Sequence, residues 1–363
     1  MGNSHKNKLR LRYLGIDTYK EAVIYIHANS AVCKSEGFES QSRIQVRYKD
    51  KSLIATLNKV SSDLLGTEEA SLSLQAWKSL CAIEGEEIEV AHPVPVTSLS
   101  HVRSKIYGNE LQADELREII YDIVQSRYSD IEIASFVTAC AGGHLDKKEI
   151  IYLTQAMVDA GQKLDWPKEL VVDKHCIGGL PGNRTTPIIV PIVAAFGLTM
   201  PKTSSRAITS PAGTADTMEV LAPVNLDIAN IKRVVEKEEG CIVWGGAFSL
   251  SPADDLLIRI ERILDLDSEG QLVASILSKK IACGATHVLI DIPVGPTAKV
   301  RTLDHAERLA ASLEATGSWF GLTVLSHISD GNQPVGRGIG PALEARDVLA
   351  VLKGKPRRRT LTR

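Results

Sequence analysis

The sequence contains no Cys-x-x-Cys pair, and its six cysteines are scattered along the 363 residues. Zinc ribbons and a disulfide framework both need clustered cysteines, so neither class is expected. The formal net charge is only -2, which provides no long-range field for nucleic acid or an anionic membrane. Scattered free thiols suit a reducing compartment. We therefore expect a cytoplasmic protein whose partners are small molecules, with no nucleic acid among them.

Long apolar runs are also missing, so no segment is expected to cross a membrane. The first residues, Met-Gly-Asn-Ser-His-Lys-Asn-Lys, lack the hydrophobic segment of a signal peptide. Hydrophobic residues nevertheless make up 44% of the chain, enough to bury a sizeable core. The length predicts a soluble, globular protein of two or three domains.

Residues 1–95 form the first predicted domain, which is rich in β-structure. Short segments with β-branched and aromatic residues alternate there with polar turns. The predicted strands are Leu9–Leu14, Ala22–His27, Ile44–Tyr48, Leu53–Asn58 and Ile88–Ala91. Pro93 and Pro95 predict an extended linker after the last strand.

Residues 96–168 predict a small helical subdomain. An apolar stripe with the spacing of one helical face, which we interpret as core, consists of Leu116, Ile119, Ile120, Ile123 and Val124. A second helix is predicted near Ile131–Cys140. Asp146 and Glu149 form a capping-box pattern at the start of a third helix, which should end at Gly161.

Residues 169–363 alternate short apolar strands with helices, which predicts an α/β domain with a parallel sheet and right-handed crossovers. The predicted strands lie near residues 170, 199, 242, 287 and 323, and the predicted helices near 188, 231, 256, 272 and 306. A final helix is predicted over Pro341–Leu352. Sheets of this kind bind ligands at the C-terminal ends of their strands.

Two turns rich in glycine and hydroxyl side chains follow the first two strands of this domain. The first reads Lys-His-Cys-Ile-Gly-Gly from Lys174, and the second reads Lys-Thr-Ser-Ser-Arg-Ala-Ile-Thr-Ser from Lys202. Glycines let the backbone approach an oxyanion closely, and free N–H groups at a helix start point toward it. Together the turns predict a phosphate site, although each alone would also suit a tight connection from strand to helix.

Other features of these turns narrow the kind of site. Lys174 adds a mobile positive charge, and Thr185 or Thr186 is predicted to cap the next helix, with Pro187 at its first position. No Gly-Lys-Ser/Thr sequence closes either turn, and neither turn contains Gly-x-Gly-x-x-Gly. The nucleoside-triphosphate loop and the dinucleotide fingerprint are therefore excluded.

Both turns resemble signatures of the thymidine phosphorylase and AMP phosphorylase family of nucleoside phosphorylases. Lys-His-Cys-Ile-Gly-Gly is similar to the family's Lys-His-Ser-x-Gly-Gly, and Ser204–Glu219 is similar to its second signature. Further matches downstream begin at Gly240, Ser251, Asp267 and Asp330. The resemblance covers about residues 10–354 and is strongest to the branch that includes the archaeal AMP enzymes.

This resemblance implies an architecture. The β-rich region corresponds to the N-terminal β-barrel-like domain of that branch, and the helical subdomain closes over the α/β domain with the substrate between them. The resemblance further implies a homodimer that needs no metal or organic cofactor and uses inorganic phosphate as its co-substrate. Family members continue past the helix at 341–352 into a C-terminal domain, which we expect to be missing from this chain.

The resemblance also implies roles for individual residues. Phosphate contacts fall on Lys174, Gly178, Gly179, Thr186, Ser204 and Thr214. Substrate contacts fall on Ser205, Arg206, Ala207, Ile208, Thr209, Ser210, Ser275, Lys279 and Lys299. Assistance to the leaving base falls on Asp267, which matches the proton donor of the AMP branch, or on His175. A lone histidine, however, is more often structural.

Simpler structural interpretations stand beside these roles. Asp267 also has the position of a helix N-cap, and work as a general acid would require burial, Asp265 or Glu269 to raise its pKa. Ser275 and Lys279 lie four residues apart on one predicted helix and share a face. That spacing suits a pair reaching one ligand, but it also suits an ordinary surface pair.

Two departures from the family pattern bear on activity. Cys176 replaces the usual serine, so a hydroxyl donor becomes a weak thiol. Ile260, flanked by Arg259 and Arg262, stands where thymidine phosphorylases carry the arginine that reads the pyrimidine. That difference puts pyrimidine specificity in question. Bacterial-looking relatives with the same Lys-His-Cys and Val-Gly-Pro-Thr-Ala-Lys sequences are nevertheless commonly taken as thymidine phosphorylases.

We therefore predict a pentosyltransferase that cleaves thymidine with phosphate to thymine and 2-deoxyribose 1-phosphate, in pyrimidine nucleoside salvage. One alternative is AMP phosphorolysis to adenine and ribose 1,5-bisphosphate. A second is an inactive, shortened homologue that binds nucleotide or phosphate. A third is a phosphoribosyltransferase of related architecture, which would need a diphosphate substrate and usually magnesium.

Overall fold

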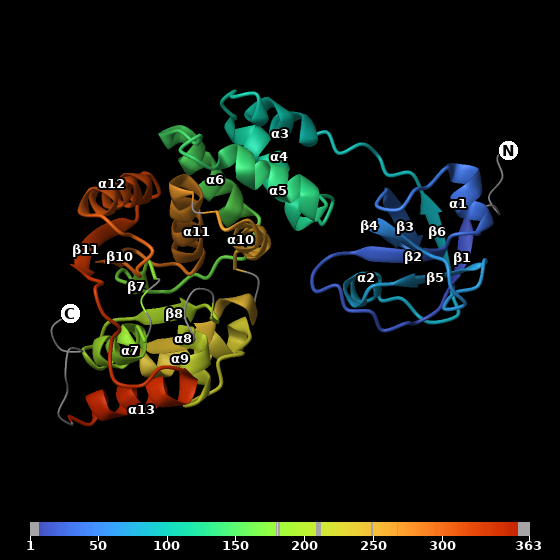
Figure 1. Ribbon diagram of the computed structural model, residues 1–363. Helices are drawn as coiled ribbons and strands as arrows, with labels where there is room; N and C mark the ends of the chain where they lie inside the picture. Colours follow the sequence, from blue (N-terminus) through green and yellow to red (C-terminus); the bar gives the residue numbers. More distant parts are fainter. Residues whose placement is uncertain are drawn as a thin grey trace. The chain divides into compact units, whose positions relative to one another are not determined.

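The computed structural model describes residues 7–354 apart from 179, 181, 208–211, 248–249 and 267. The chain forms two compact units (Figure 1). The first unit comprises Met1–Asn109 with Tyr121–Ala139, and the second comprises Glu110–Ile120 with Cys140–Arg363. The boundary between them passes through helix α4 (Ala113–Val124).

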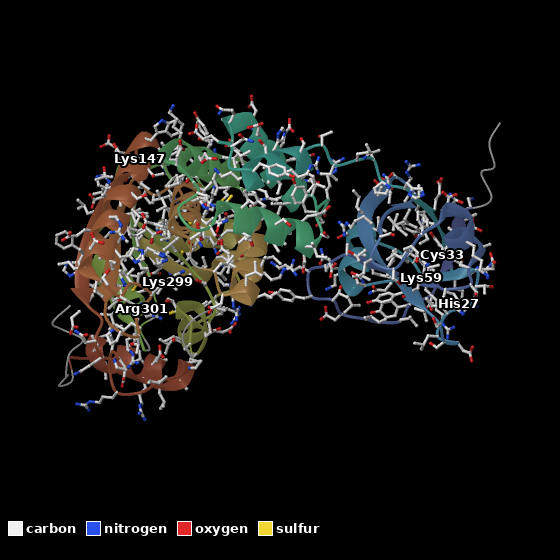
Figure 2. All side chains as sticks on the ribbon, turned by 45° about the horizontal axis from the view of Figure 1, so that its top comes forward. His27, Cys33, Lys59, Lys147, Lys299 and Arg301 are labelled. Carbon is white, nitrogen blue, oxygen red and sulfur yellow. The ribbon has the colours of Figure 1, made fainter. Side chains whose placement is uncertain are left out.

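The first unit contains a closed β-barrel with the strand order β1-β5-β2-β4-β3-β6. Its strands are β1 (Lys8–Leu11), β2 (Val23–His27), β3 (Arg43–Tyr48), β4 (Lys51–Val60), β5 (Glu69–Leu72) and β6 (Glu87–Ala91). In several strands alternate residues point inward, as in Ile24 and Ile26 or Ile44 and Val46, and none of these four side chains is exposed. Cys33 lies in the same core (Figure 2). The predicted β-barrel-like fold is confirmed.

Three short barrel elements were not expected from the sequence: α1 (Ala31–Glu36), α2 (Leu74–Leu80) and β5. The β5 sequence, Glu-Ala-Ser-Leu, has little β-branched or aromatic character. It is a strand because β1 and β2 pair with it on either side. Ser73 then caps α2 by accepting a hydrogen bond from the Ala76 backbone. Tertiary pairing therefore overrides local propensity at β5.

The helical stretch contains α3 (Leu99–Ile106), α4, α5 (Asp130–Cys140) and α6 (Lys147–Asp159). The predicted apolar stripe on α4 is buried at Leu116, Ile119, Ile120 and Ile123. The predicted capping box at α6 is confirmed, because Asp146 accepts from the Glu149 backbone and Glu149 accepts in return.

The second unit contains two parallel sheets, with strand orders β11-β10-β7 and β8-β9. The strands are β7 (Val172–Cys176), β8 (Met200–Ser204), β9 (Gly240–Trp244), β10 (His287–Val294) and β11 (Thr323–Asp330). A single parallel bridge between Val171 and Thr199 joins β7 to β8 at their N-terminal ends. All five strands lie where the alternation of apolar and polar segments predicts them.

The helices of this unit are α7 (Thr185–Ala195), α8 (Thr214–Glu219), α9 (Ile228–Glu238), α10 (Pro252–Leu264), α11 (Glu269–Ala282), α12 (Leu303–Trp319) and α13 (Pro341–Leu352), with a short 3-10 helix η1 (Gly245–Ala247). In Figure 1, α11 and α12 lie on one side of β7 and β10, and α7, α9 and α13 lie on the other. Within the described part of the chain, no helix is long and apolar enough to span a membrane.

Candidate functional site

Strands β7 and β8 carry the two predicted anion turns at their C-terminal ends. Because the strands are parallel and joined by the Val171–Thr199 bridge, both ends lie at the same edge of the α/β unit. Lys174 and His175 belong to β7, and Ser204 is the last residue of β8. The fold thus brings together turns that are about thirty residues apart in the sequence.

Lys174 is held in place rather than mobile, contrary to the expectation from its sequence position. Its side chain is 4% exposed. The ammonium donates to Thr185 Oγ1 at 2.6 Å and pairs with Asp291 Oδ2 at 3.3 Å. Asp291 also accepts from the Ser329 hydroxyl at 2.5 Å. These contacts hold a buried, oriented cation in the strand that leads into the first glycine turn.

The first turn needs glycine at two described positions. Gly178 has φ 97° and Gly182 has φ 70°, in the region that residues with a Cβ rarely adopt. A Cβ on Gly182 would lie 2.5 Å from an Arg184 nitrogen and from the Val335 carbonyl oxygen. The Gly178 carbonyl accepts from the Lys299 backbone at 3.3 Å, which brings Lys299 beside this turn. Gly179 lies outside the described residues.

The start of α7 differs from the predicted cap. The N-cap is Arg184, without a side-chain capping bond, and Thr185 and Thr186 are the first two helical residues. Thr185 does not cap the helix, because its hydroxyl contacts the Asn183 side chain at 2.8 Å and the Lys174 ammonium. Thr186 is buried. Helix α7 therefore begins slightly earlier than expected. The Thr185 hydroxyl accepts a hydrogen bond from Lys174 and does not cap the helix.

The second turn is held mainly by Arg206. Its guanidinium bonds to Asp216 at 3.0 Å and to both carboxylate oxygens of Glu219 at 2.7 and 2.9 Å. It also lies 4.9 Å from the centre of the Trp244 ring. Arg206 therefore braces the turn against α8, and its guanidinium is engaged within the protein.

The other residues of the second turn differ in exposure. Ser204 donates its hydroxyl to the Val243 carbonyl at 3.0 Å, and Thr214 is the first residue of α8. Ser205 and Ala207 are exposed, and the Ala207 backbone donates to Asp216 at 2.8 Å. The predicted contacts Ile208, Thr209 and Ser210 lie outside the described residues.

His175 and Cys176 both lie in environments that keep them uncharged. Burial, followed by the charges of Lys280, Lys202, Lys279 and Lys174, lowers the pKa of His175 well below its usual value. Burial also raises the pKa of Cys176 to about 11, and its sulfur accepts from the Asn183 amide at 2.6 Å. At neutral pH the site therefore presents a neutral imidazole and a neutral thiol.

The predicted nucleobase contacts lie on α11. Lys279 donates to the Ser275 hydroxyl at 3.1 Å, so the expected shared face is confirmed. The Lys279 ammonium also bonds to Asp254 Oδ2 of α10 at 2.7 Å, and Asp254 is buried. Ile260 of α10 is 3% exposed. Its side chain belongs to the core and is not available to read a base.

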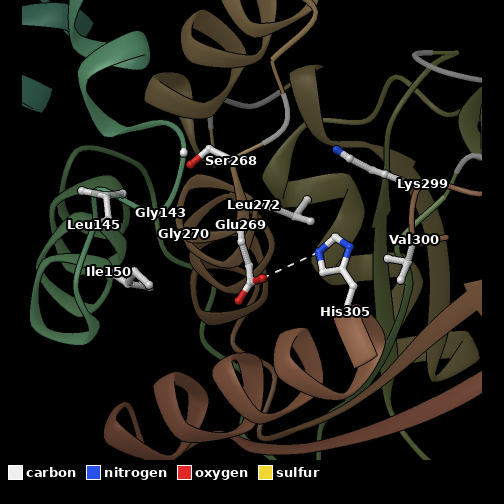
Figure 3. Close-up of a pocket in the computed structure, with 11 residues that line it drawn as sticks. Gly143, Leu145, Ile150, Ser268, Glu269, Gly270, Leu272, Lys299, Val300 and His305 are labelled. Carbon is white, nitrogen blue, oxygen red and sulfur yellow. Dashed lines mark ion pairs between the residues drawn. The ribbon is translucent and has the colours of Figure 1, made fainter. Parts of the chain in front are cut away.

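A cavity of about 320 Å³ lies beside the start of α11 (Figure 3). Lys299 and Ser268 border it, and an ion pair of 3.6 Å joins Glu269 to His305 at its wall. Asp267, the predicted proton donor, precedes Ser268 but lies outside the described residues. Asp265, one predicted neighbour for it, is an exposed helix C-cap with φ 51°.

A network of buried charges beneath the strand ends was not anticipated. Asp173 of β7 bonds to Lys280 of α11 at 2.7 Å and lies 3.8 Å from Lys202 of β8. Asp291 of β10 forms a second buried ion pair of this kind, with Lys174 of β7. Lysine and aspartate inside otherwise apolar strands could have predicted these ion pairs from the sequence, since such charged residues are rarely buried unless they are paired.

Comparison with known proteins gives the family. Residues 100–161 match the helical bundle domain of a glycosyl transferase family, and residues 168–360 match its a/b domain. A "putative thymidine phosphorylase" of Legionella pneumophila strain Philadelphia 1 is 64% identical over 348 residues, covering 96% of this chain and 67% of its own. One from Polaromonas sp. JS666 is 62% identical over 347 residues, covering 96% and 68%.

The fold also has a solved counterpart. Anthranilate phosphoribosyltransferase from Thermus thermophilus superposes with a TM-score of 0.56 over 71% of this chain and 83% of its own, at 18% identity. Together these findings define an enzyme of the pentosyltransferase type. The chain belongs to the thymidine phosphorylase-like glycosyl transferase family, and it spans about two thirds of the length of the curated relatives that it matches.

Proposed function

We propose that this chain is a nucleoside phosphorylase that cleaves thymidine with inorganic phosphate. The position of Lys174 supports this most directly. It is a buried ammonium in the middle of β7, the strand that leads into a turn that requires glycine at Gly178 and Gly182. An oxyanion at this edge would meet an oriented cation and backbone N–H groups. The names of the relatives support thymidine as the nucleoside.

The reaction requires a bound phosphate close to the sugar. A phosphate oxygen forms a bond to C1′, the bond between C1′ and the base nitrogen breaks, and the electron pair leaves with the base. Lys174, with Thr186, Ser204, Thr214 and the backbone of the first turn, would hold and orient the phosphate. The products would be thymine and 2-deoxyribose 1-phosphate, with no metal or organic cofactor.

The base would lie against α11. Ser275 and Lys279 would contact it, and Asp254 fixes the Lys279 ammonium for that role. Because the pKa of His175 is lowered, a neutral imidazole would donate a hydrogen bond to the base instead of releasing a proton. Delivery of a proton would then fall to Asp267.

AMP is the second candidate substrate, and one observation favours it. Ile260 is buried in α10, so no side chain at this position reads a pyrimidine. A nucleoside 5′-phosphate would also bring a second anion that Lys299, at the cavity beside α11, could attract.

We further propose that the protein acts as a cytoplasmic homodimer in pyrimidine metabolism, with domains at residues 1–95, 96–168 and 169–363.

The test measures release of free base from thymidine, uridine and AMP, each with and without phosphate and with a chelator present. Thymine release that depends on phosphate supports the proposal, whereas adenine release from AMP favours the second candidate. Activity that needs a pentose diphosphate and magnesium would indicate a phosphoribosyltransferase. Phosphate binding without release of any base would indicate an inactive homologue.

A substitution tests the central residue. Lys174→Ala should reduce phosphate-dependent cleavage by about 100-fold or more, because an oriented charge is lost from the site. Lys237→Ala is the matched control, since this lysine of α9 is exposed and distant in sequence from the predicted site residues. Unchanged turnover in Lys174→Ala would refute the assigned role.

A further inference from the structure

Beneath the two anion turns, two lysines share one aspartate. Asp173 of β7 pairs with Lys280 of α11 at 2.7 Å and with Lys202 of β8 at 3.8 Å. The side chains of all three residues are 6% exposed or less. The second ammonium is therefore compensated poorly, because one carboxylate can balance only one of the two charges.

The cluster connects three of the elements that carry predicted site residues, namely β7, β8 and α11. In a strand, alternate residues point to the same face, so Lys202 shares its face with Ser204, and Asp173 shares its face with His175. Lys280 follows Lys279 on α11. The Lys202 ammonium also donates to the Thr203 carbonyl, close to the end of β8. The shared aspartate thus ties together the strands before both turns and the helix with the predicted base contacts.

Charged and titratable groups face Lys202 from each element around it. They are Asp173 and His175 of β7, Lys280 of α11, Cys283 after α11 and Cys241 of β9. Among the described residues of this group, Asp173 carries the compensating negative charge, since burial raises the thiol pKa values of Cys241 and Cys283 to about 12 and 11. A bound oxyanion would supply further negative charge.

We propose that Lys202 is a positioning residue for the anionic co-substrate, and that its buried amine takes up a proton when a tetrahedral oxyanion binds at the ends of β7 and β8. This inference rests on the proposed function, because it uses the same anion site. An arriving negative charge favours the protonated form of a neighbouring amine. The charged lysine then stabilises the bound anion in return.

The state of Lys202 without ligand is consistent with this behaviour. Burial, and next the charge of Lys280, lower its pKa to about 7, so that a large part of the amine is neutral at pH 7.5. Burial lowers the pKa of Lys280 as well, but its close pairing with Asp173 opposes this effect, and the pKa of Lys280 is raised overall. The two lysines therefore differ in protonation, and Lys202 is the member that can respond to an anion.

Calorimetric titration of the full chain with sulfate at pH 7.5 tests this inference. Sulfate does not titrate near this pH, so comparing buffers of different ionisation enthalpy gives the protons taken up per bound ion. We expect uptake of about half a proton or more. Lys202→Met should abolish the uptake and weaken binding. Lys202→Arg, which remains charged, should bind sulfate without uptake.

Two further variants distinguish the Lys202 amine from other titratable groups. Lys237→Met, in an exposed part of α9, should keep the uptake of the original chain. His175→Gln should keep it as well, because this proposal assigns the proton to the Lys202 amine and not to the His175 imidazole, whose pKa is also lowered. Loss of uptake in His175→Gln would assign the proton to the imidazole and overturn the proposal, as would unchanged uptake in Lys202→Met.

The same titration distinguishes this inference from the proposed function. Sulfate-linked proton uptake that depends on Lys202 supports the inference even if no nucleoside is cleaved, a result that would reject the phosphorylase function alone. Absence of sulfate binding, or binding without proton uptake, overturns the inference even if thymine is released. Near-ultraviolet circular dichroism of each variant shows whether the native packing is retained.

Discussion

At the scale of single residues, burial decides what each charged group can do. Lys174 is buried but satisfied, with Thr185 and Asp291 both within bonding distance of its ammonium. Lys202 is equally buried, yet its nearest carboxylate lies 3.8 Å away and already pairs with Lys280. Identical side chains on neighbouring strands therefore have different properties. The Lys174 side chain is held by two close partners, whereas burial and the charge of Lys280 lower the pKa of Lys202 to about 7.

The lowered pKa of Lys202 predicts a pH-dependent stability. In the unfolded chain a lysine titrates near 10.4, so between about pH 7 and pH 10 the unfolded state binds a proton that the folded state lacks. The free energy of unfolding should therefore rise as the pH rises through this window, and fall as the pH is lowered toward 7.

Urea unfolding at pH 7.5 and 8.5 measures this effect. Between these two values Lys202 should contribute a rise of about 1 kcal/mol to the free energy of unfolding. That contribution should be missing in Lys202→Met, whereas Lys237→Met should show the same rise as the original chain. Equal slopes in all three proteins would mean that the Lys202 amine is not perturbed.

At the scale of elements, helix α13 supports the first anion turn. Arg184, at the start of α7, is completely buried, and its guanidinium bonds to Asp347 of α13 and to the Gly338 and Gly182 carbonyls. Ile188 packs against Val348 and Val351 beside this contact. The Arg184 guanidinium therefore links the first anion turn to the loop before α13 and to α13 itself.

Replacing Arg184 should loosen this support. Arg184→Met removes the charged partner of Asp347 and leaves the Gly182 and Gly338 carbonyls without this donor, which should lower the free energy of unfolding by about 3 kcal/mol. The phosphate KM should rise more than kcat falls, because the turn that holds phosphate loses its brace. Arg308→Met, in an exposed pair on α12, is the control and should change little. Similar losses in both variants would argue against a special role for Arg184.

At the scale of the whole molecule, the proposed anion site predicts stabilisation by phosphate. A ligand that binds only the folded state at 100 times its Kd adds about 2.7 kcal/mol to the free energy of unfolding. Thermal unfolding should therefore shift upward with phosphate but not with chloride at equal ionic strength. Lys174→Ala should remove most of the shift. An equal shift with both salts would indicate screening of surface charge in place of a site.

Much of the architecture follows from local sequence patterns. The capping box at Asp146, the apolar stripe on α4 and the strands β7 to β11 all lie where periodicity and turn chemistry predict them. These signals are local, since they involve residues within a few positions of one another. The strand β5 was missed because its residues favour no particular structure and two barrel neighbours impose one. The predicted domain boundaries remain a prediction.

The candidate site likewise has local features that the sequence predicts and long-range contacts that it does not. The sequence by itself determined the glycine turns, the lysine before the first turn and the pairing of Ser275 with Lys279, because each depends on neighbouring residues in one strand or helix. Only the tertiary structure decided which charges meet. Asp173 and Lys280 are 107 positions apart, and Lys174 and Asp291 are 117 apart. Such contacts form when crossovers stack distant elements, and burial then sets the protonation of His175 and Lys202.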